Sequence, residues 1–155
     1  RDWSSDVCSS DLVSMGGNMV VNFGPQPDGD FRPEEKFMAK AIGEWMKKYG
    51  SAIYGCDYAG LDKQDWGYYT RDKEGYVYMV IFNQPYSKQL TVKIPENTRI
   101  DQAILVNSKE HLKVIETTRN EYNVSAPAIS PDEPYVIRLK LSEKGTTTNY
   151  KEALT

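Results

Sequence analysis

The chain has 155 residues, with 19 basic against 22 acidic side chains and a formal net charge of -3. This length suits one domain of ordinary size or a part of a larger protein. The acidic balance, with an isoelectric point near 5.3, argues against nucleic acid as a partner. No apolar run approaches the ~20 residues of a membrane-spanning helix, so no membrane partner is expected.

The chain is poor in residues that bind metals. Two cysteines, Cys8 and Cys56, are too few for a disulfide framework and lack the spacing of metal ligands. His111 is the sole histidine, and it falls in a polar stretch that predicts an exposed loop. We therefore expect no metal site, no cofactor and no catalytic pairing that depends on histidine within this chain.

Residues 1–12, RDWSSDVCSSDL, differ in character from the rest of the chain. They repeat Ser-Ser-Asp and have neither the basic nor the apolar region of a signal peptide. The segment resembles a translated sequencing-adapter tail, and we interpret it as non-native, with a junction between Asp11 and Val13. A genuine polar terminus is the alternative. On the first interpretation, the natural protein is expected to continue upstream.

Residues 14–22, SMGGNMVVN, form a short apolar run that two glycines introduce. A run without alternation predicts a strand buried on both faces, as in a parallel sheet or a barrel. Phe23-Gly24-Pro25 ends it, and residues 26–30, QPDGD, have the composition of a turn. Asp28 and Asp30 flank a glycine there, which favours turn formation over a metal or acid/base role.

Pro33 begins a predicted amphipathic helix. Two glutamates fill its first turn and two lysines its last, which complements the helix dipole. Gly50 stands where a left-handed C-terminal cap is expected. The apolar face consists of Phe37, Met38, Ala41, Ile42, Trp45, Met46 and Tyr49. Trp45 lies on this face, so we assign it to a core and not to sugar stacking.

From Trp66 onward the apolar period changes to two residues. Tyr76–Phe82 is apolar on both faces and predicts a central strand. Further strands are expected at residues 90–94, 100–106, 113–117 and 135–141. Turn signals recur at roughly the 8–12-residue spacing of an antiparallel sandwich. The fold class is therefore α+β, one βα unit followed by an all-β domain, with the boundary between Tyr54 and Asp65.

An ordered series of motifs resembles the α-L-fucosidases of glycoside hydrolase family 29. The motifs are Gly16–Pro25 (GGNMVVNFGP), Asp28-Gly29, Pro33–Glu35 (PEE), Ile42–Trp45 (IGEW) and Ala52–Gly55 (AIYG). This resemblance covers about residues 13–55. Residues 66–70, WGYYT, and the strands after them fit the C-terminal sandwich of the family more loosely.

The resemblance implies a domain organisation and an activity. Residues 13–55 would be the C-terminal end of a catalytic (β/α)8-type barrel, 56–65 a linker and 66–155 a C-terminal β-sandwich. Such enzymes release terminal α-L-fucose from fucosylated glycans or fucosides with retention, using an aspartate nucleophile and a separate carboxylic acid/base. Both precede the last barrel strand in the family, so the catalytic residues are expected upstream of residue 1 and the chain alone is expected to be inactive. Family members are commonly exported, periplasmic or secreted, or lysosomal.

Two residues are candidates for substrate binding, Asn22 and Phe23. They lie at the carboxyl end of the predicted barrel strand, where barrel enzymes build their sites. Phe23 would offer an apolar wall to the 6-deoxy methyl group of fucose, or it packs beneath the barrel mouth. For Asn22, holding the following turn is favoured over contact with sugar.

The remaining candidate residues and the sandwich each allow a structural and a functional interpretation. Glu34 and Glu35 are adjacent on a helix and diverge by about 100°, so they are helix-start charges and not a facing catalytic pair. Tyrosines at 68, 69, 76 and 78 suit strand packing better than a sugar platform. The sandwich either braces the barrel, which we favour, or binds glycans by itself. The sequence does not indicate an oligomeric state.

Overall fold

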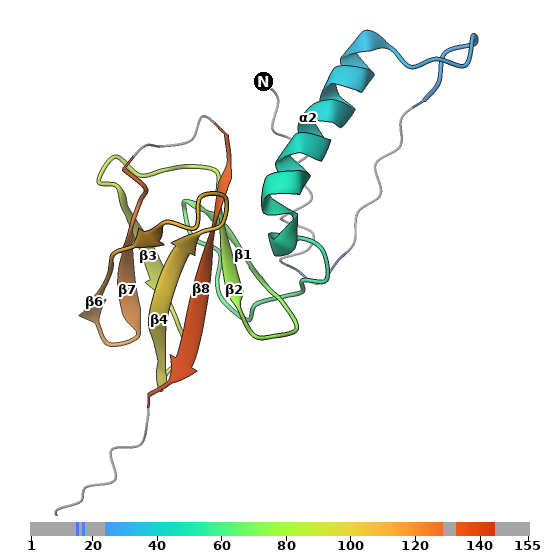
Figure 1. Ribbon diagram of the computed structural model, residues 1–155. Helices are drawn as coiled ribbons and strands as arrows, with labels where there is room; N and C mark the ends of the chain where they lie inside the picture. Colours follow the sequence, from blue (N-terminus) through green and yellow to red (C-terminus); the bar gives the residue numbers. More distant parts are fainter. Residues whose placement is uncertain (1–14, 16, 18–23, 129–132, 145–155) are drawn as a thin grey trace, which may run out of the picture.

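The computed structural model (Figure 1) describes residues 15, 17, 24–128 and 133–144. The tail of residues 1–12 lies outside the described residues, and so does the strand expected within residues 14–22, apart from Met15 and Gly17. The described part is α+β, with one α-helix, one short 3-10 helix and eight strands, all paired antiparallel. No described helix has the length and apolar character needed to cross a membrane.

The helix α2 (Pro33–Tyr49) has the bounds that the sequence predicts. The left-handed cap predicted at Gly50 is wrong: this residue has φ -59° and ψ -22°, and the chain continues into the 3-10 helix η1 (Gly50–Ala52). A Cβ atom on Gly50 would lie 2.9 Å from the ring of Tyr54. The glycine therefore provides space for a neighbouring ring and not a left-handed backbone.

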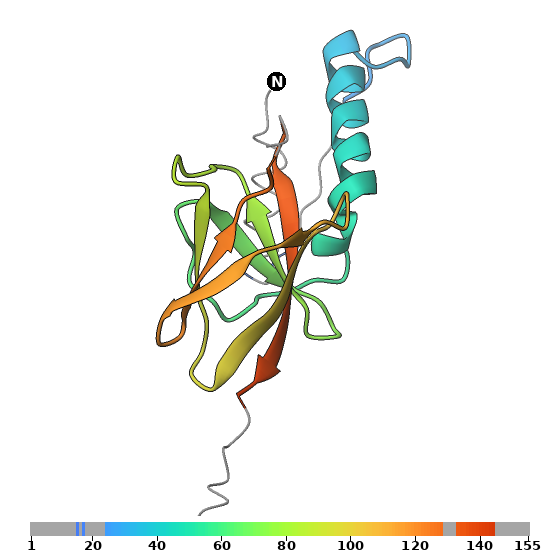
Figure 2. The same cartoon turned by 60° about the vertical axis from the view of Figure 1, so that its left-hand side comes forward.

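The strands form two sheets. Their bounds are β1 (Gly67–Arg71), β2 (Val77–Ile81), β3 (Gln89–Lys93), β4 (Thr98–Leu105), β5 (His111–Leu112), β6 (Val114–Thr118), β7 (Glu121–Ser125) and β8 (Tyr135–Glu143). One sheet has the order β1-β2-β8-β4-β5 and the other β3-β7-β6. The two sheets face each other in both views, as expected for a sandwich (Figures 1 and 2).

The core confirms the assignment of the central strand. All five residues of β2 are buried, and β1 and β8 pair with its two edges, so β2 has no free edge for a further strand. Leu90 and Val92 of β3 and Val124 of β7 are fully buried, as alternation requires. His111 is exposed as predicted, but it lies in β5 and not in a loop, because its backbone pairs with Ile104.

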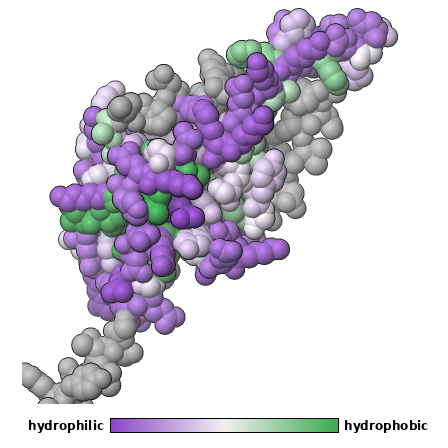
Figure 3. Space-filling model, viewed as in Figure 1, coloured by the Kyte–Doolittle hydropathy of each residue, from purple (hydrophilic) through white to green (hydrophobic). Residues whose placement is uncertain are grey.

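The C-terminal half of α2 lies beside the sandwich, and its N-terminal end projects beyond it (Figures 1 and 2). Trp45 and Tyr49 are each 1% exposed, whereas Phe37 on the same apolar face is 67% exposed. Trp45 is therefore a core residue, as predicted, but the apolar face is buried only at one end. Hydrophilic side chains cover most of the face seen in Figure 3, with apolar ones showing mainly over the sandwich.

Two buried hydrogen bonds fix the helical segment to the sandwich. The Trp45 Nε1–H group donates to the carbonyl oxygen of Pro134 at 2.8 Å, across 89 residues of chain. The Thr70 hydroxyl on β1 donates to the carbonyl oxygen of Ala52 in η1 at 2.6 Å. We call these contacts, with the ion pair of Lys48 and Glu133 at 2.6 Å, the helix–sandwich junction.

Candidate functional site

The two predicted substrate-binding residues, Asn22 and Phe23, lie outside the described residues, so their positions stay predictions. The described chain resumes directly after them, at Gly24. It forms a tight turn up to the start of α2, and this turn and the first turn of α2 contain the described part of the candidate site.

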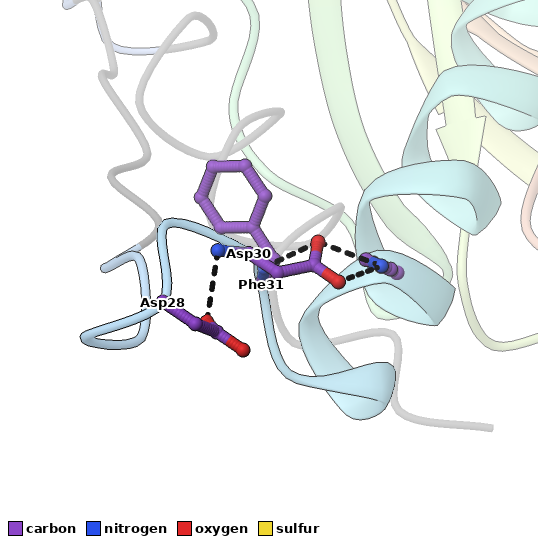
Figure 4. A network of polar contacts seen from close by, with 4 residues as sticks. Asp28, Asp30 and Phe31 are labelled. Carbon is purple, nitrogen blue, oxygen red and sulfur yellow. Dashed lines mark hydrogen bonds and ion pairs between the residues drawn. The ribbon is translucent and has the colours of Figure 1, made fainter.

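The turn is held by backbone and carboxylate hydrogen bonds. The Gln26 amide donates to the Asp30 carbonyl oxygen at 2.6 Å, and the Gly29 amide donates to the Gln26 carbonyl oxygen at 2.8 Å. Gly29 has φ +84°, a conformation that glycine adopts without strain. Asp28 Oδ1 accepts the amide of Asp30 at 3.1 Å. Figure 4 shows these side chains folded back onto their own turn, which confirms the predicted structural role of both aspartates.

An ion pair joins the turn to the helix. Lys36 Nζ lies 2.8 Å from Asp30 Oδ1 and 2.9 Å from Oδ2, and Oδ1 also accepts the amide of Phe31 at 2.9 Å (Figure 4). The hydrogen bond from Lys36, and secondly that from the Phe31 amide, hold the pKa of Asp30 below its usual value of 3.8. Asp30 is thus an ionised clamp at neutral pH and has no proton to give in acid catalysis.

An open pocket of about 700 Å³ adjoins this turn. Residues 24–28, Arg32 and Glu35 line it. The adjacent Glu34 is exposed and does not line the pocket, so the two glutamates do diverge, as the helix geometry predicts. Glu35 Oε2 is buried and has no hydrogen-bond partner among the described residues. A buried carboxylate oxygen normally accepts a hydrogen bond, and the described residues do not supply the donor for this one.

The sequence reasoning did not single out Arg32 or assign a binding role to Glu35. The available signal was their spacing of three residues at the start of a helix, which puts both on one side of the chain. That signal is weak without the pocket, because charged residues at helix starts are common.

The four tyrosines proposed as strand packing are engaged in contacts within the protein. Tyr69 is 2% exposed and its ring meets Trp66 edge-on at 4.9 Å, while the Tyr78 hydroxyl donates to Asp72 at 3.1 Å. Lys63 lies 4.6 Å from the centroid of the Tyr68 ring, and Arg138 lies 4.7 Å from that of Tyr76. These contacts favour packing, as predicted, over an open sugar platform.

Cys56 has a structural environment, and the described residues form no cluster of metal ligands. Cys56 lies in the loop after η1, half-buried, and its thiol donates to the carbonyl oxygen of Ser51 at 3.2 Å. Burial raises the pKa of this thiol, and a hydrogen bond with the Thr70 side chain partly opposes the rise. The thiol is therefore protonated and neutral at neutral pH. Within residues 24–128 and 133–144, no three His, Cys, Asp or Glu side chains come together as metal ligands.

A second cleft, of about 380 Å³, lies on the sandwich. Leu61, Arg71 and Leu141 are among the residues that line it, and no aromatic ring does. Ligand-binding sites are commonly lined by hydrophobic and aromatic side chains. The cleft therefore gives little support to an independent glycan-binding module.

Comparison with known proteins gives one consistent family. A family model described as alpha-L-fucosidase matches residues 10–51. An alpha-L-fucosidase from Branchiostoma floridae is 28% identical over 138 residues, which are 84% of this chain and 31% of the relative. A bacterial fucosidase solved with a monovalent iminocyclitol inhibitor is 59% identical, with a TM-score of 0.86 over 92% of this chain and 35% of the other.

A second solved structure is a GH29 alpha-L-fucosidase from Bacteroides thetaiotaomicron, trapped as a covalent intermediate with 2-fluoro-fucosyl fluoride. It is 60% identical, with a TM-score of 0.85 over 92% of this chain and 35% of the other. The chain thus spans about a third of the length of these relatives.

Proposed function

We propose, from the membership of this chain in the α-L-fucosidase family, glycoside hydrolase family 29, that the protein it belongs to releases terminal α-L-fucose from fucosylated glycans or fucosides. The observation that carries the proposal is the identity of 59–60% to two bacterial fucosidases, over 92% of this chain. Identity at this level, with TM-scores of 0.85 and 0.86, supports a shared activity as well as a shared fold.

The proposed reaction retains the anomeric configuration. One carboxylate attacks the anomeric carbon of fucose while a second carboxylic acid protonates the departing oxygen; water then displaces the enzyme carboxylate. Two carboxyl groups about 5–5.5 Å apart are needed for this chemistry. The covalent intermediate of the Bacteroides thetaiotaomicron relative supports this course. Neither carboxyl group is assigned to this chain, which is proposed to be inactive alone.

In this proposal, residues 13–55 close the catalytic barrel and 66–155 are its C-terminal sandwich, joined by 56–65. Residues 1–12 would be foreign to the protein. The last barrel strand then ends at Asn22 and Phe23, and Phe23 would face the 6-deoxy methyl group of fucose. The compartment, exported or lysosomal, is proposed from the family alone, and a leader sequence upstream of Val13 would test it.

The test uses the full-length protein recovered from the natural gene. We expect it to hydrolyse 4-nitrophenyl α-L-fucoside and to give α-L-fucose as the first product by proton NMR. The 155-residue chain, purified in the same way, serves as the control and is expected to be inactive. A folded full-length protein with no activity on any α-L-fucoside would refute the proposal.

For the sandwich, we propose a bracing role. The helix–sandwich junction supports it, because Trp45, Thr70 and Lys48 all tie the helical segment to the sandwich. The alternative is that the sandwich binds glycans by itself. Its test is a glycan array with the full-length protein, comparing wild type with a variant changed at Arg71 in the sandwich cleft; loss of a signal in the variant would favour the alternative.

A further inference from the structure

The helix–sandwich junction is directional as well as apolar. At each of two buried points, a side chain of one part donates to a main-chain carbonyl oxygen of the other: Trp45 to Pro134 at 2.8 Å, and Thr70 to Ala52 at 2.6 Å. Among the residues that the structure describes, Thr70 is the one buried residue with a polar, non-aromatic side chain. Valine would fill nearly the same space with no hydroxyl group to satisfy. The buried hydroxyl therefore indicates a requirement for orientation in addition to packing.

The two hydrogen bonds hold the helical segment at separate places on the sandwich. Thr70 lies on β1, the edge strand of its sheet, whereas Pro134 directly precedes β8, two strands further along the same sheet. The ion pair of Lys48 with Glu133 lies beside the second place. Attachments on two different strands fix the direction of a rigid helix as well as its position. The C-terminal end of α2 is therefore held in one orientation.

The other end of α2 carries the turn of the candidate site. This end projects beyond the sandwich (Figures 1 and 2), and Phe37 within it is 67% exposed. At about 1.5 Å per residue, Pro33 lies about 18 Å along the helix axis from Trp45. A tilt of about 3° at Trp45 therefore moves Pro33 by about 1 Å. The ion pair of Asp30 with Lys36 makes the turn follow the helix.

The consequence for catalysis rests on the proposed function. There, residues 24–32 connect the last barrel strand to its helix, and Gly24 directly follows the residues proposed to contact fucose. Such connections lie on the face of the barrel where the substrate binds. A misplacement of about 1 Å in an active site, even one caused by a remote change, can cost about a hundred-fold in rate. The reaction would therefore depend on the orientation of α2, which the sandwich fixes.

We infer that Thr70 and Trp45 are positioning residues for the proposed reaction. By setting the direction of α2, they set where the residues that contact fucose lie. This role goes beyond bracing, which predicts only a loss of stability when the junction is weakened. Thr70 contacts neither the substrate nor the reacting atoms, because it acts through the carbonyl group of Ala52 and the helix before it.

The test changes Thr70 in the full-length protein. Thr70→Val removes the hydroxyl group, and Thr70→Ser keeps it. Thr91→Val is the matched control, because the hydroxyl that it removes donates to Asn123 Oδ1 at 3.3 Å within the β3-β7-β6 sheet. Trp45→Phe, with Trp66→Phe as its control, repeats the comparison at the second attachment. Each variant is assayed on 4-nitrophenyl α-L-fucoside at a temperature at which circular dichroism shows it to be folded.

Thr70→Val is expected to raise KM about five-fold and to leave kcat within about two-fold, because the displaced residues contact the fucose ring and not the reacting atoms. L-Fucose, added as a competitive inhibitor, should bind this variant about five-fold more weakly, which is a measurement independent of turnover. Thr70→Ser and Thr91→Val should stay within about two-fold of wild type in both. Trp45→Phe should behave as Thr70→Val does, and Trp66→Phe as wild type.

A fall in kcat with KM unchanged would overturn the inference, because partial unfolding lowers the number of active molecules without altering those that remain. Unchanged kinetics in Thr70→Val and Trp45→Phe, with a lower melting temperature, would overturn it as well, since bracing alone predicts that result. So would an equal rise of KM in Thr70→Ser or Thr91→Val. If wild type hydrolysed no α-L-fucoside, the proposed function itself would fail, and with it the premise of this inference.

Discussion

The indole nitrogen of Trp45 donates a hydrogen bond to the carbonyl oxygen of Pro134 at 2.8 Å, and both residues are buried. Trp45 comes from the helix that the family resemblance assigns to the barrel. Pro134 immediately precedes β8, a central strand of the sandwich. One hydrogen bond thus connects the two parts of the chain that sequence reasoning separated, and it does so next to the most buried region of the helix.

We expect Trp45→Phe in the full-length protein to loosen α2 from the sandwich. The change removes the donor, leaves the Pro134 carbonyl buried without a partner, and opens a small void, at a combined cost of about 2–4 kcal/mol. Amide hydrogen exchange should rise in residues 33–52. A rise confined to the strands, with the helix unchanged, would contradict the bracing role.

Trp66→Phe is the matched control. Trp66 is 2% exposed, and its indole nitrogen donates to the carbonyl oxygen of Thr91 at 2.8 Å, so the lost interactions are alike. That bond joins the residue immediately before β1 to β3, within the sandwich. Faster exchange is therefore expected in the strands for this variant, and the contrast between the two tryptophans separates a junction effect from a general loss of stability.

Gly67 is expected to tolerate no side chain. It has φ +153°, and a Cβ atom there would lie 1.9 Å from the carbonyl oxygen of Val80 on the paired strand. Val80 lies on β2, which is paired on both edges and cannot move away cheaply, so Gly67→Ala should destabilise the sandwich by about 3 kcal/mol. Chemical denaturation of the full-length protein, followed by the fluorescence of the nearby Trp66, measures this.

Gly43→Ala, in contrast to Gly67→Ala, is expected to raise stability. This glycine lies within α2, and a Cβ atom there would meet nothing within 4 Å. Alanine has the higher helix propensity, so the substitution should stabilise the helix by up to about 1 kcal/mol. Similar destabilisation by both alanines would show that the close approach of the Val80 carbonyl oxygen is not what makes Gly67→Ala destabilising.

The local elements were the predictable part of the fold. Pro33, the charged end turns and the period of four fixed the helix, and two-residue alternation found the strands that contain Leu90 and Ile137. The strand β7 was missed, because only Tyr122 and Val124 are buried in it and its polar residues resemble a loop. Two apolar residues are too short a pattern to distinguish a strand from a turn.

The sequence did not predict which neighbouring element packs against the apolar face of α2. The helix shows one continuous apolar face in sequence, yet Trp45 is buried and Phe37 is mostly exposed. Periodicity says which side of a helix is apolar and not which neighbour lies against it. The pocket was missed for a related reason: Arg32 and Glu35 have ordinary helix-start chemistry, and only the folded turn brings them next to Pro25 and Pro27.

The clamp between Asp30 and Lys36 should be visible in a pH titration. The lowered pKa of Asp30 means that the ionised form is stabilised by folding, so its contribution is present at neutral pH and is lost as the pH falls below 3.8. Carbon NMR of aspartate-labelled protein should show this carboxyl titrating below the ordinary value. Asp30→Asn identifies the resonance.

Lys36→Met should raise that pKa toward 3.8, since the hydrogen bond from Lys36 is its main cause. Lys40→Met removes the same charge from an exposed position of the helix and should leave the resonance unchanged. An unchanged titration in Lys36→Met would indicate that the ion pair does not form in solution. Because Asp30 is exposed, the effect on overall stability should be small.

Stability should fall in alkali because of two sandwich tyrosines. Burial raises the pKa of Tyr135 to about 12; burial, and then its hydrogen bond to Asp72, raise that of Tyr78 to about 12. In the unfolded chain both titrate near pH 10. Between about pH 10 and pH 12 the unfolded state therefore loses protons that the folded state keeps, and the free energy of unfolding decreases.

Denaturation of the full-length protein at about pH 9 and about pH 11 should show this loss, on the order of 1 kcal/mol for each tyrosine. Tyr135→Phe should reduce the pH dependence, even though it also removes the hydrogen bond to Gln84 and lowers stability at both pH values. The slope, and not the absolute stability, is thus the diagnostic quantity. An unchanged slope in Tyr135→Phe would mean that this hydroxyl ionises equally well in the folded and unfolded chain.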